Sequence, residues 1–222
     1  MTDGHLRQQR DEMVQVITAH AYVARAQIGK EMLDDRVLEV MARVPRHEFV
    51  PAELSAYAYI DRPLPIGYEK TISQPFIIAL MTDLAEIRST DAVLEVGTGL
   101  GYHTAVLAEL AGKVYSVEII EELAVQARKR LAPRGYANVE MRVGNGEHGW
   151  PERAPFDRIV VCAASELVPA ALITQLKPGG RMVIPAGLAD AQTLMVVERT
   201  LQGRVKTREV LPVRFAPMET AN

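Results

Sequence analysis

The sequence of 222 residues is poor in cysteine, because Cys162 is the only one. One cysteine cannot form an internal disulfide or supply the paired thiolates of a common zinc motif. Disulfides are typical of exported proteins and rare in the cytosol. We therefore expect a cytoplasmic protein in which Cys162 is a small buried hydrophobic residue rather than a nucleophile.

Long hydrophobic runs and a dominant charge are also missing. No apolar run approaches the ~20 residues that cross a bilayer, and the first residues, MTDGHLRQQRDEM, are charged where a signal peptide has an apolar core. The 25 Lys and Arg side chains nearly balance the 28 Asp and Glu side chains, for a formal charge of −3. Such a chain has no strong field to attract nucleic acid or an anionic membrane. We expect neither as a partner.

Histidine is scarce and scattered, which bears on metal binding. The five histidines stand at positions 5, 20, 47, 103 and 148. No two of them have the i, i+4 spacing that places two ligands on one face of a helix. The sequence therefore predicts no metal site.

What the sequence does contain is enough apolar material for a real core, with 48% hydrophobic and 24% charged residues. Helical periodicity over 6–28 and 34–43 predicts two helices. Prolines at 45, 51, 63, 65 and 75 then favour an irregular segment. We divide the chain into a helical and proline-shaped cover, residues 1–75, and a main domain, residues 76–222, which opens with an apolar helix over 76–87.

From Ala92 onward, short apolar runs alternate with amphipathic stretches. The expected strands are AVLEV, VYSVE, VEMRV, DRIVVC and RMVIP, and the expected helices cover 103–110, 120–131 and 167–176. The segment Lys177-Pro178-Gly179-Gly180 should separate the last helix from its strand. This rhythm predicts an α/β fold with a doubly wound, mostly parallel sheet. Two further strands, TLMVVER and RVKTREVLPV, predict an antiparallel C-terminal hairpin.

A glycine loop follows the first of these strands. Gly97, Gly99 and Gly101 stand in the order G-x-G-x-G between a strand and a helix, where doubly wound sheets bind ligands. A dinucleotide fingerprint needs G-x-G-x-x-G, whereas G-x-G-x-G is common in enzymes that use S-adenosylmethionine. The alternative is a glycine-lined turn that binds no ligand.

Two polar loops follow the next strands at the same edge. Glu118 ends the second strand, about twenty residues past the first glycine, where a carboxylate accepts hydrogen bonds from ribose hydroxyls. Its alternative role is that of a solvated residue at the start of the following helix. The third loop, Gly144 to Trp150, is a candidate for holding adenine.

These residues resemble the protein-L-isoaspartate O-methyltransferase family over about 44–218. The resemblance is carried by VPRHEFVP, DRPLPIGYEKTISQP, LEVGTGLGY, VYSVE, GNGEHGWPERAPFD, LKPGGRMVIPAG and LPVRFAP, of which TISQP is the most specific. It implies the S-adenosylmethionine-dependent methyltransferase fold and methyl transfer from S-adenosylmethionine to the α-carboxylate of L-isoaspartyl residues in damaged proteins. The resulting ester is lost through a succinimide that can reopen to normal aspartate. We expect a monomer.

The resemblance also implies site residues. Those for the cofactor are Gly97, Thr98, Gly99, Gly101, Glu118, Asn145 and Gly146. Those for the substrate are Thr71, Ile72 and Val213, with Ser73 as the catalytic residue that aligns the accepting carboxylate. By its spacing alone, Ser73 is better placed as an N-cap, because Pro75 follows it in the first helical turn. Val213 also has an alternative role, as part of an ordinary edge strand that binds no substrate.

The chemistry agrees with the sparse set of reactive residues. An α-carboxylate has a pKa of ~3.5, so it is ionised at neutral pH and needs no general base. The sequence accordingly lacks a Ser-His-Asp or paired-carboxylate arrangement. A pocket poor in water should accelerate the attack of a carboxylate on a sulfonium methyl group, because opposite charges cancel.

Three parts of the chain depart from the family pattern. Asn145 replaces the aspartate of the usual G-D-G loop, although its oxygen can still accept a hydrogen bond. Cys162 stands where threonine is frequent. Tyr68-Glu69-Lys70 replaces smaller or more polar residues at the rim of the substrate cleft.

Two other functions remain to be weighed. A methyltransferase for small molecules or nucleic-acid bases is one, but base N-methylation usually brings an Asp/Asn-Pro-Pro-Tyr element where this chain has Val161 to Ser165. A binding module that keeps cofactor affinity without turnover is the other. Asn145 supports that reading and Ser73 argues against it.

Overall fold

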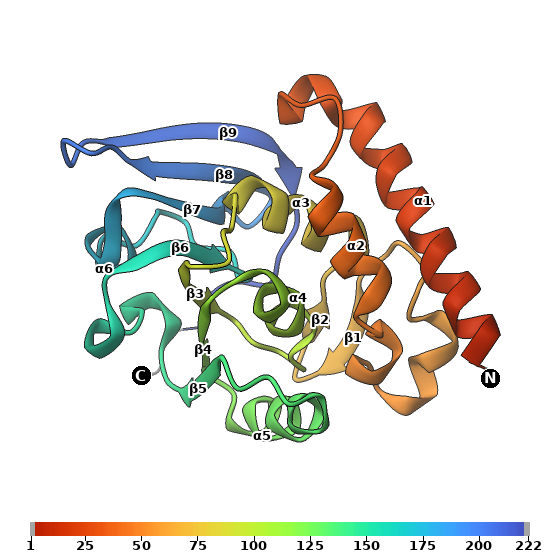
Figure 1. Cartoon of the computed structure of the whole chain (residues 1–222). Helices are drawn as coiled ribbons and strands as arrows, with labels where there is room; N and C mark the ends of the chain where they lie inside the picture. Colours follow the sequence, from red (N-terminus) through yellow and green to blue (C-terminus); the bar gives the residue numbers. More distant parts are fainter. Residues whose placement is uncertain (1–2, 220–222) are drawn as a thin grey trace.

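The computed structural model describes residues 3–219, and these form a sheet covered by helices (Figure 1). The sheet has seven strands in the order β5-β4-β3-β6-β7-β8-β9. Their bounds are β3 Ala92–Val96, β4 Lys113–Glu118, β5 Val139–Val143, β6 Phe156–Val161, β7 Leu176–Leu188, β8 Ala191–Arg199 and β9 Val205–Val213. The helices of this part are α3 Pro75–Ala85, α4 Tyr102–Leu110, α5 Glu121–Leu131 and α6 Ala170–Gln175.

The expected α/β architecture is confirmed. Strands β3 to β7 run parallel, and most side chains of β3, β4 and β6 are buried, as expected for strands covered on both faces. The antiparallel hairpin is also present, with β8 beside β7 and β9 at the edge. Because the chain leaves β3 toward β4 and later returns to β6 on its other side, the strand order reverses at β3. Ligands of such sheets bind at the carboxyl ends of the strands at this point.

One predicted helix and its stop signal were placed wrongly. The helix expected over 167–176 is confined to α6, which starts only after Pro169. The segment from Lys177 to Gly180, expected to separate helix from strand, lies within β7. There the pairing with β6 jumps from Phe156↔Leu176 to Arg158↔Arg181. A sheet can absorb extra residues in one strand as a bulge, so the Pro-Gly-Gly run does not end the strand.

The N-terminal segment begins with the two predicted helices, α1 Asp3–Ile28 and α2 Asp35–Arg43. The Asp34 side chain caps α2 by accepting a bond from the Arg36 backbone N–H. The proline-rich stretch is more regular than predicted, because β1 Leu64–Gly67 and β2 Lys70–Ile72 form an antiparallel hairpin. Pro65 is tolerated there because a two-stranded sheet has free edges. Short 3₁₀ helices complete the chain: η1 Arg46–Phe49, η2 Ala52–Tyr57, η3 Ala132–Arg134, η4 Gly146–His148 and η5 Pro151–Arg153.

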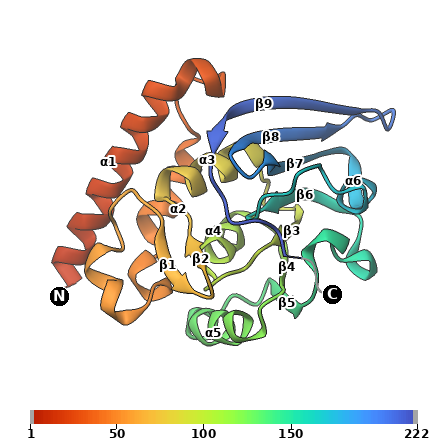
Figure 2. The same ribbon diagram turned by 180° about the vertical axis from the view of Figure 1, so that it is seen from behind.

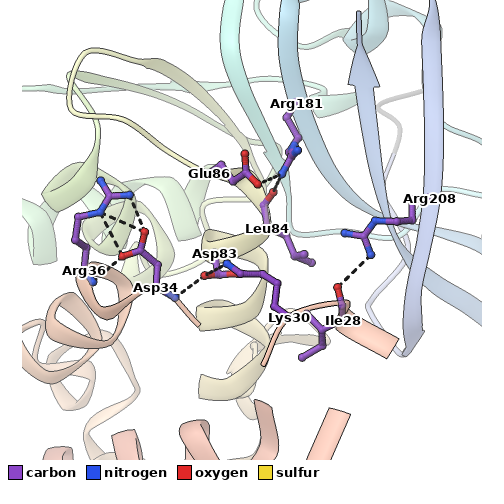
Figure 3. Close-up of polar contacts among 9 residues, drawn as sticks. All are labelled: Ile28, Lys30, Asp34, Arg36, Asp83, Leu84, Glu86, Arg181 and Arg208. Atoms are coloured by element: carbon purple, nitrogen blue, oxygen red, sulfur yellow. Dashed lines mark hydrogen bonds and ion pairs between the residues drawn. The ribbon is translucent and has the colours of Figure 1, made fainter. Parts of the chain in front are cut away.

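Polar contacts fasten the N-terminal segment to α3 and the sheet (Figure 3). Lys30, just after α1, places its Nζ 2.7 Å from the carboxylate of Asp83 on α3, whose side chain is fully buried. The same carboxylate accepts a bond from the Asp34 backbone N–H. Arg208 of β9 donates to the carbonyl of Ile28, the last residue of α1. Arg181 of β7 pairs with Glu86, which follows α3, and so joins that helix to the sheet. The cover is thus attached to both the central helix and the edge strand.

One hydrophobic core extends through both parts of the chain. Its main cluster includes Met13 and Ile17 of α1, Leu80 of α3, Val93 of β3 and Leu211 of β9. The two segments on either side of the 75/76 boundary therefore share a core. The division of the chain into a cover and a main domain stays a prediction. Among residues 3–219, no helix combines the length and the apolar character needed to cross a bilayer.

Candidate active site

A cavity of about 540 Å³ opens at the carboxyl ends of β3, β4 and β6. Its walls come from the glycine loop, the end of β2, the start of α3 and the segment after β9, which runs back past the sheet (Figure 2). Nine of the predicted site residues line it: Thr71, Ile72, Ser73, Gly97, Thr98, Gly99, Glu118, Gly146 and Val213. Gly101 and Asn145 are not in its wall.

The glycine loop has the conformation that its composition requires. Gly97 has φ +93° and donates its N–H to the carbonyl of Val117, 2.8 Å away, which ties the loop to β4. Gly101 also has φ +93°, and a Cβ there would lie 3.1 Å from Leu131 of α5. Both positions therefore need glycine, but Gly101 serves the packing of α4 against α5 rather than the cavity wall.

Glu118 is a buried carboxylate at the end of β4, with 5% of its surface exposed. It accepts bonds from the backbone N–H groups of Gly99 (2.8 Å) and Ile120 (3.0 Å). Burial raises the pKa of this carboxyl above its usual value, and the two N–H bonds oppose that rise. The reading of Glu118 as a solvated residue is therefore wrong. Each oxygen has acceptor capacity beyond these two bonds.

In the third loop, Gly146 lines the cavity, whereas Asn145 caps a short helix. The Oδ1 atom of Asn145 accepts a bond from the Glu147 N–H at 2.9 Å and so caps η4. A Cβ at Gly146 would lie 2.3 Å from the Val96 side chain, so glycine is required there by packing alone.

Ser73 is not the N-cap of α3. That position belongs to Gln74, whose side chain makes no capping bond, and the carboxylate of Asp61 accepts the Phe76 N–H at 2.7 Å instead. Arg46 holds Ser73 from the other side by donating from Nη2 to its carbonyl, 2.7 Å away. The Ser73 hydroxyl is therefore not required for capping, and Ser73 is one of the residues that line the cavity.

Arg46 and Asp61 contact the backbone next to Ser73, and the sequence alone did not single them out. Arg46 is fully buried, and desolvation lowers its pKa to about 10. It also donates to the carbonyl of Ala58 and lies over the ring of Tyr102. The only available signal was the presence of both residues in motifs shared with the family. Their spacing gives no hint of these long-range contacts.

The family of the chain follows from its similarity to known proteins. The family model described as Protein-L-isoaspartate(D-aspartate) O-methyltransferase (PCMT) matches residues 18–222. The chain belongs to this family. Membership confirms the predicted family, the function of a protein-L-isoaspartate O-methyltransferase, and S-adenosylmethionine as the cofactor.

Close relatives support the assignment along the whole chain. The enzyme is 58% identical over 221 residues to Protein-L-isoaspartate O-methyltransferase 1 of Polaromonas sp., covering 100% of this chain and 94% of that one. It is also 58% identical to Protein-L-isoaspartate O-methyltransferase 2 of Syntrophobacter fumaroxidans, over 94% of this chain and 85% of the relative.

Solved structures share the fold. One protein-L-isoaspartate O-methyltransferase has a TM-score of 0.80 and 26% identity, over 95% of this chain and 66% of that chain. A putative member from Plasmodium falciparum, in complex with S-adenosyl-L-homocysteine, has a TM-score of 0.75 and 22% identity, over 92% of this chain and 97% of that one.

The residues of the cavity suit S-adenosylmethionine. The volume of the cavity lies in the range usual for small-molecule sites. A buried carboxylate with spare acceptor capacity, Glu118, faces the same space as the glycine loop. Apolar side chains of Ile66, Ile77 and Leu123 complete the wall. Glu118 can accept hydrogen bonds from a ribose, and the apolar side chains can contact the flat face of an adenine ring.

Proposed function

We propose that the enzyme methylates the α-carboxylate of L-isoaspartyl residues in damaged proteins. The observation that carries this proposal is that Ser73 and the glycine loop, more than twenty residues apart, line one cavity. The proposed cofactor residues are Gly97, Thr98, Gly99, Gly101, Glu118, Asn145 and Gly146. The proposed substrate residues are Thr71, Ile72 and Val213, with Ser73 catalytic.

The cofactor residues act in two ways. Glu118 is placed to accept bonds from ribose hydroxyls, while Gly97 and Gly99 let the backbone approach the ligand. Gly101 and Asn145 act indirectly, since Gly101 fixes the packing of the helix behind the loop and Asn145 caps the turn that presents Gly146. When bound, S-adenosylmethionine supplies an electrophilic methyl group on a sulfonium.

The chain's main task at the reacting centre is alignment. The substrate α-carboxylate is already ionised at neutral pH, so no residue has to remove a proton. The Ser73 hydroxyl donates a hydrogen bond to one carboxylate oxygen and leaves the other free to attack. Arg46 and Asp61 hold the backbone around Ser73 in place. Correct orientation of this kind accounts for a large share of rate acceleration.

The cavity also limits water around the reacting charges. The β1–β2 hairpin covers one side with Ile66 and Ile72, and the segment from Pro212 to Glu219 covers another. Lys70 on β2 forms an ion pair with Glu219, which joins the two covers. An attack that cancels opposite charges is favoured where water is scarce.

Substrate selectivity follows from the position of the carboxylate. An isoaspartyl residue has a free α-carboxylate, and its main chain is longer by one methylene than that of an aspartyl residue. Transfer of labelled methyl from S-adenosylmethionine to matched isoaspartyl and aspartyl peptides tests the function. We expect at least ~100-fold preference for the isoaspartyl peptide. Equal rates on both, or no transfer to either, would contradict the proposal.

The setting of the enzyme is part of the same proposal. We infer a monomer in the cytoplasm whose partners are damaged proteins, without a nucleic-acid or membrane partner. The support for this is the near balance of charge and the single cysteine. Sedimentation of the purified enzyme with and without nucleic acid tests the monomer and the absence of that partner.

A further inference from the structure

Three side chains that the methyl transfer does not use meet behind the glycine loop. They are Glu95 of β3, His103 of α4 and Cys162, which follows β6. One potential ligand atom from each lies within 4.8 Å of the others. Cys162 and His103 also line the cavity, so the cluster can be reached from it. Because the three residues come from different elements, their sequence spacing gave no sign of it.

The hydrogen bonds of His103 fix which ring nitrogen carries the proton. The Thr82 hydroxyl donates its hydrogen to the Ile78 carbonyl at 2.7 Å, so toward the ring it can only accept. His103 Nε2 lies 2.9 Å from this hydroxyl and must therefore be the N–H donor. Nδ1 is left with its lone pair, 3.4 Å from the Cys162 sulfur. Histidines that bind metals are typically held in this way, with the second nitrogen donating to a neighbour.

Glu95 adds a buried carboxylate to the cluster, and one of its two oxygens has no hydrogen-bond partner within residues 3–219. Its side chain is fully buried, and Oε2 accepts bonds from the hydroxyls of Thr104 and Ser116, each 2.5 Å away. Oε1 is also buried and has no hydrogen-bond partner among the described residues. A buried polar atom without a partner is costly, so such an atom calls for an explanation such as a bound ion.

We propose that Glu95, His103 and Cys162 form a binding site for a zinc-class divalent cation. Thiolate sulfur, imidazole nitrogen and carboxylate oxygen are the ligands that Zn²⁺ prefers, at about 2.0 to 2.3 Å. Those bond lengths place tetrahedral ligands roughly 3.3 to 3.7 Å apart. The 3.4 Å between Nδ1 and sulfur already fits, and shifts of about 1 Å bring in the carboxylate. On binding, the thiol proton leaves to solvent as the metal–sulfur bond forms.

Such a site leaves a fourth coordination position toward the cavity, because two of its ligands lie in the cavity wall. The Cys162 Cβ lies against the glycine loop, 3.3 Å from where a Cβ of Gly97 would be. The cation therefore enters and leaves through the space in which we propose the cofactor binds. Only the entry route rests on the proposed function, because it assumes that the cofactor binds in this cavity. The metal site itself does not depend on that function.

Metal binding to the intact enzyme tests the site directly. Equilibrium dialysis with Zn²⁺ should give one ion per chain, and Co²⁺ should give the sulfur-to-cobalt charge-transfer absorption that only a thiolate ligand produces. Cys162→Thr should abolish that absorption and weaken Zn²⁺ binding at least ~100-fold. This loss exceeds the one expected when a residue that only hydrogen-bonds to a metal ligand is removed. Glu95→Gln should weaken it roughly 10- to 100-fold. His5→Ala, which removes an exposed histidine, should change neither.

Other outcomes overturn the proposal. These are no Zn²⁺ bound at millimolar concentration, a cobalt complex without the thiolate absorption, or unchanged binding in Cys162→Thr. Circular dichroism of each variant shows whether it is folded, and Cys162→Ser provides a second variant if the threonine fails.

A kinetic experiment tests the entry route separately. If S-adenosylhomocysteine at 100 times its Kd fills the cavity, only about 1% of the enzyme stays open. Zn²⁺ uptake should then slow by up to ~100-fold. Uptake at an unchanged rate, with S-adenosylhomocysteine shown to be bound, would overturn the route through the cavity. Failure of methyl transfer in the peptide assay leaves the dialysis and cobalt results unaffected, so the two proposals fail independently.

Discussion

Ser73 occupies a position where a structural and a catalytic role can be separated by experiment. Gln74 is the N-cap of α3, and Asp61 binds the free N–H of Phe76. Ser73→Ala should therefore keep its melting temperature, while turnover falls roughly 10- to 1000-fold because one oriented donor is lost. Affinity for S-adenosylhomocysteine should stay within a few-fold. Ser89→Ala, an exposed serine outside the cavity wall, is the matched control. Wild-type turnover in Ser73→Ala would exclude the catalytic role.

Glu118 combines a binding and a structural role, so two variants are needed. Glu118→Ala removes the acceptor of the ribose hydroxyls and should weaken S-adenosylhomocysteine binding by about 1.5 to 3 kcal/mol, or roughly 10- to 150-fold, in a calorimetric titration. Glu118→Gln keeps one acceptor oxygen but loses the charge, and it should fall between the alanine variant and the wild type. If both variants bind as tightly as the wild type, the cofactor does not lie across this strand end.

At the scale of elements, the attachment of α1 and α2 to α3 depends on one buried carboxylate. Lys30→Met leaves Asp83 without its cation, so the free energy of unfolding should fall by about 1 to 3 kcal/mol; the half-exposed lysine keeps the loss below that of a fully buried pair. Arg36→Met breaks the exposed Arg36–Asp34 pair (Figure 3) and should cost no more than ~0.5 kcal/mol. Urea unfolding measures both.

A double variant checks the cause of that loss. Lys30→Met combined with Asp83→Asn removes the buried charge together with its partner, and the amide oxygen can still accept the Asp34 N–H. Part of the lost stability should return. Equal losses in Lys30→Met and Arg36→Met would show that burial of the carboxylate does not control this attachment.

At the scale of the whole molecule, the shared core predicts cooperative unfolding. Side chains of α1, α3 and the edge strand belong to one buried cluster, so residues 1–75 and 76–222 should unfold in a single transition. A fragment of residues 76–222 should expose the apolar surface that α1 and α2 cover and should lack a cooperative transition in calorimetry. A fragment that melts cooperatively near the temperature of the full chain would instead show that the main domain folds alone.

The sequence by itself determined the elements and the loops that carry the site. Apolar runs of strand length alternating with helical periodicity predicted β3 to β6, α4 and α5, because these patterns follow from local geometry. The glycine loop and Glu118 were predictable for the same reason, since parallel strands bring their carboxyl ends to one edge. The motif around Ser73 pointed to the family before any geometry was available.

Only the tertiary structure decided what those residues touch. In the structure, Asp61 accepts the free N–H at the start of α3, although it lies well before Ser73 in the chain. Asn145 accepts a capping bond from the Glu147 N–H. The tertiary structure placed the Pro-Gly-Gly run inside β7, where the pairing with β6 skips residues 177–180 as a bulge. It also brought His103 to Cys162 although 59 residues separate them. Side-chain partners distant in sequence depend on packing, and packing is a property of the whole fold that local patterns do not encode.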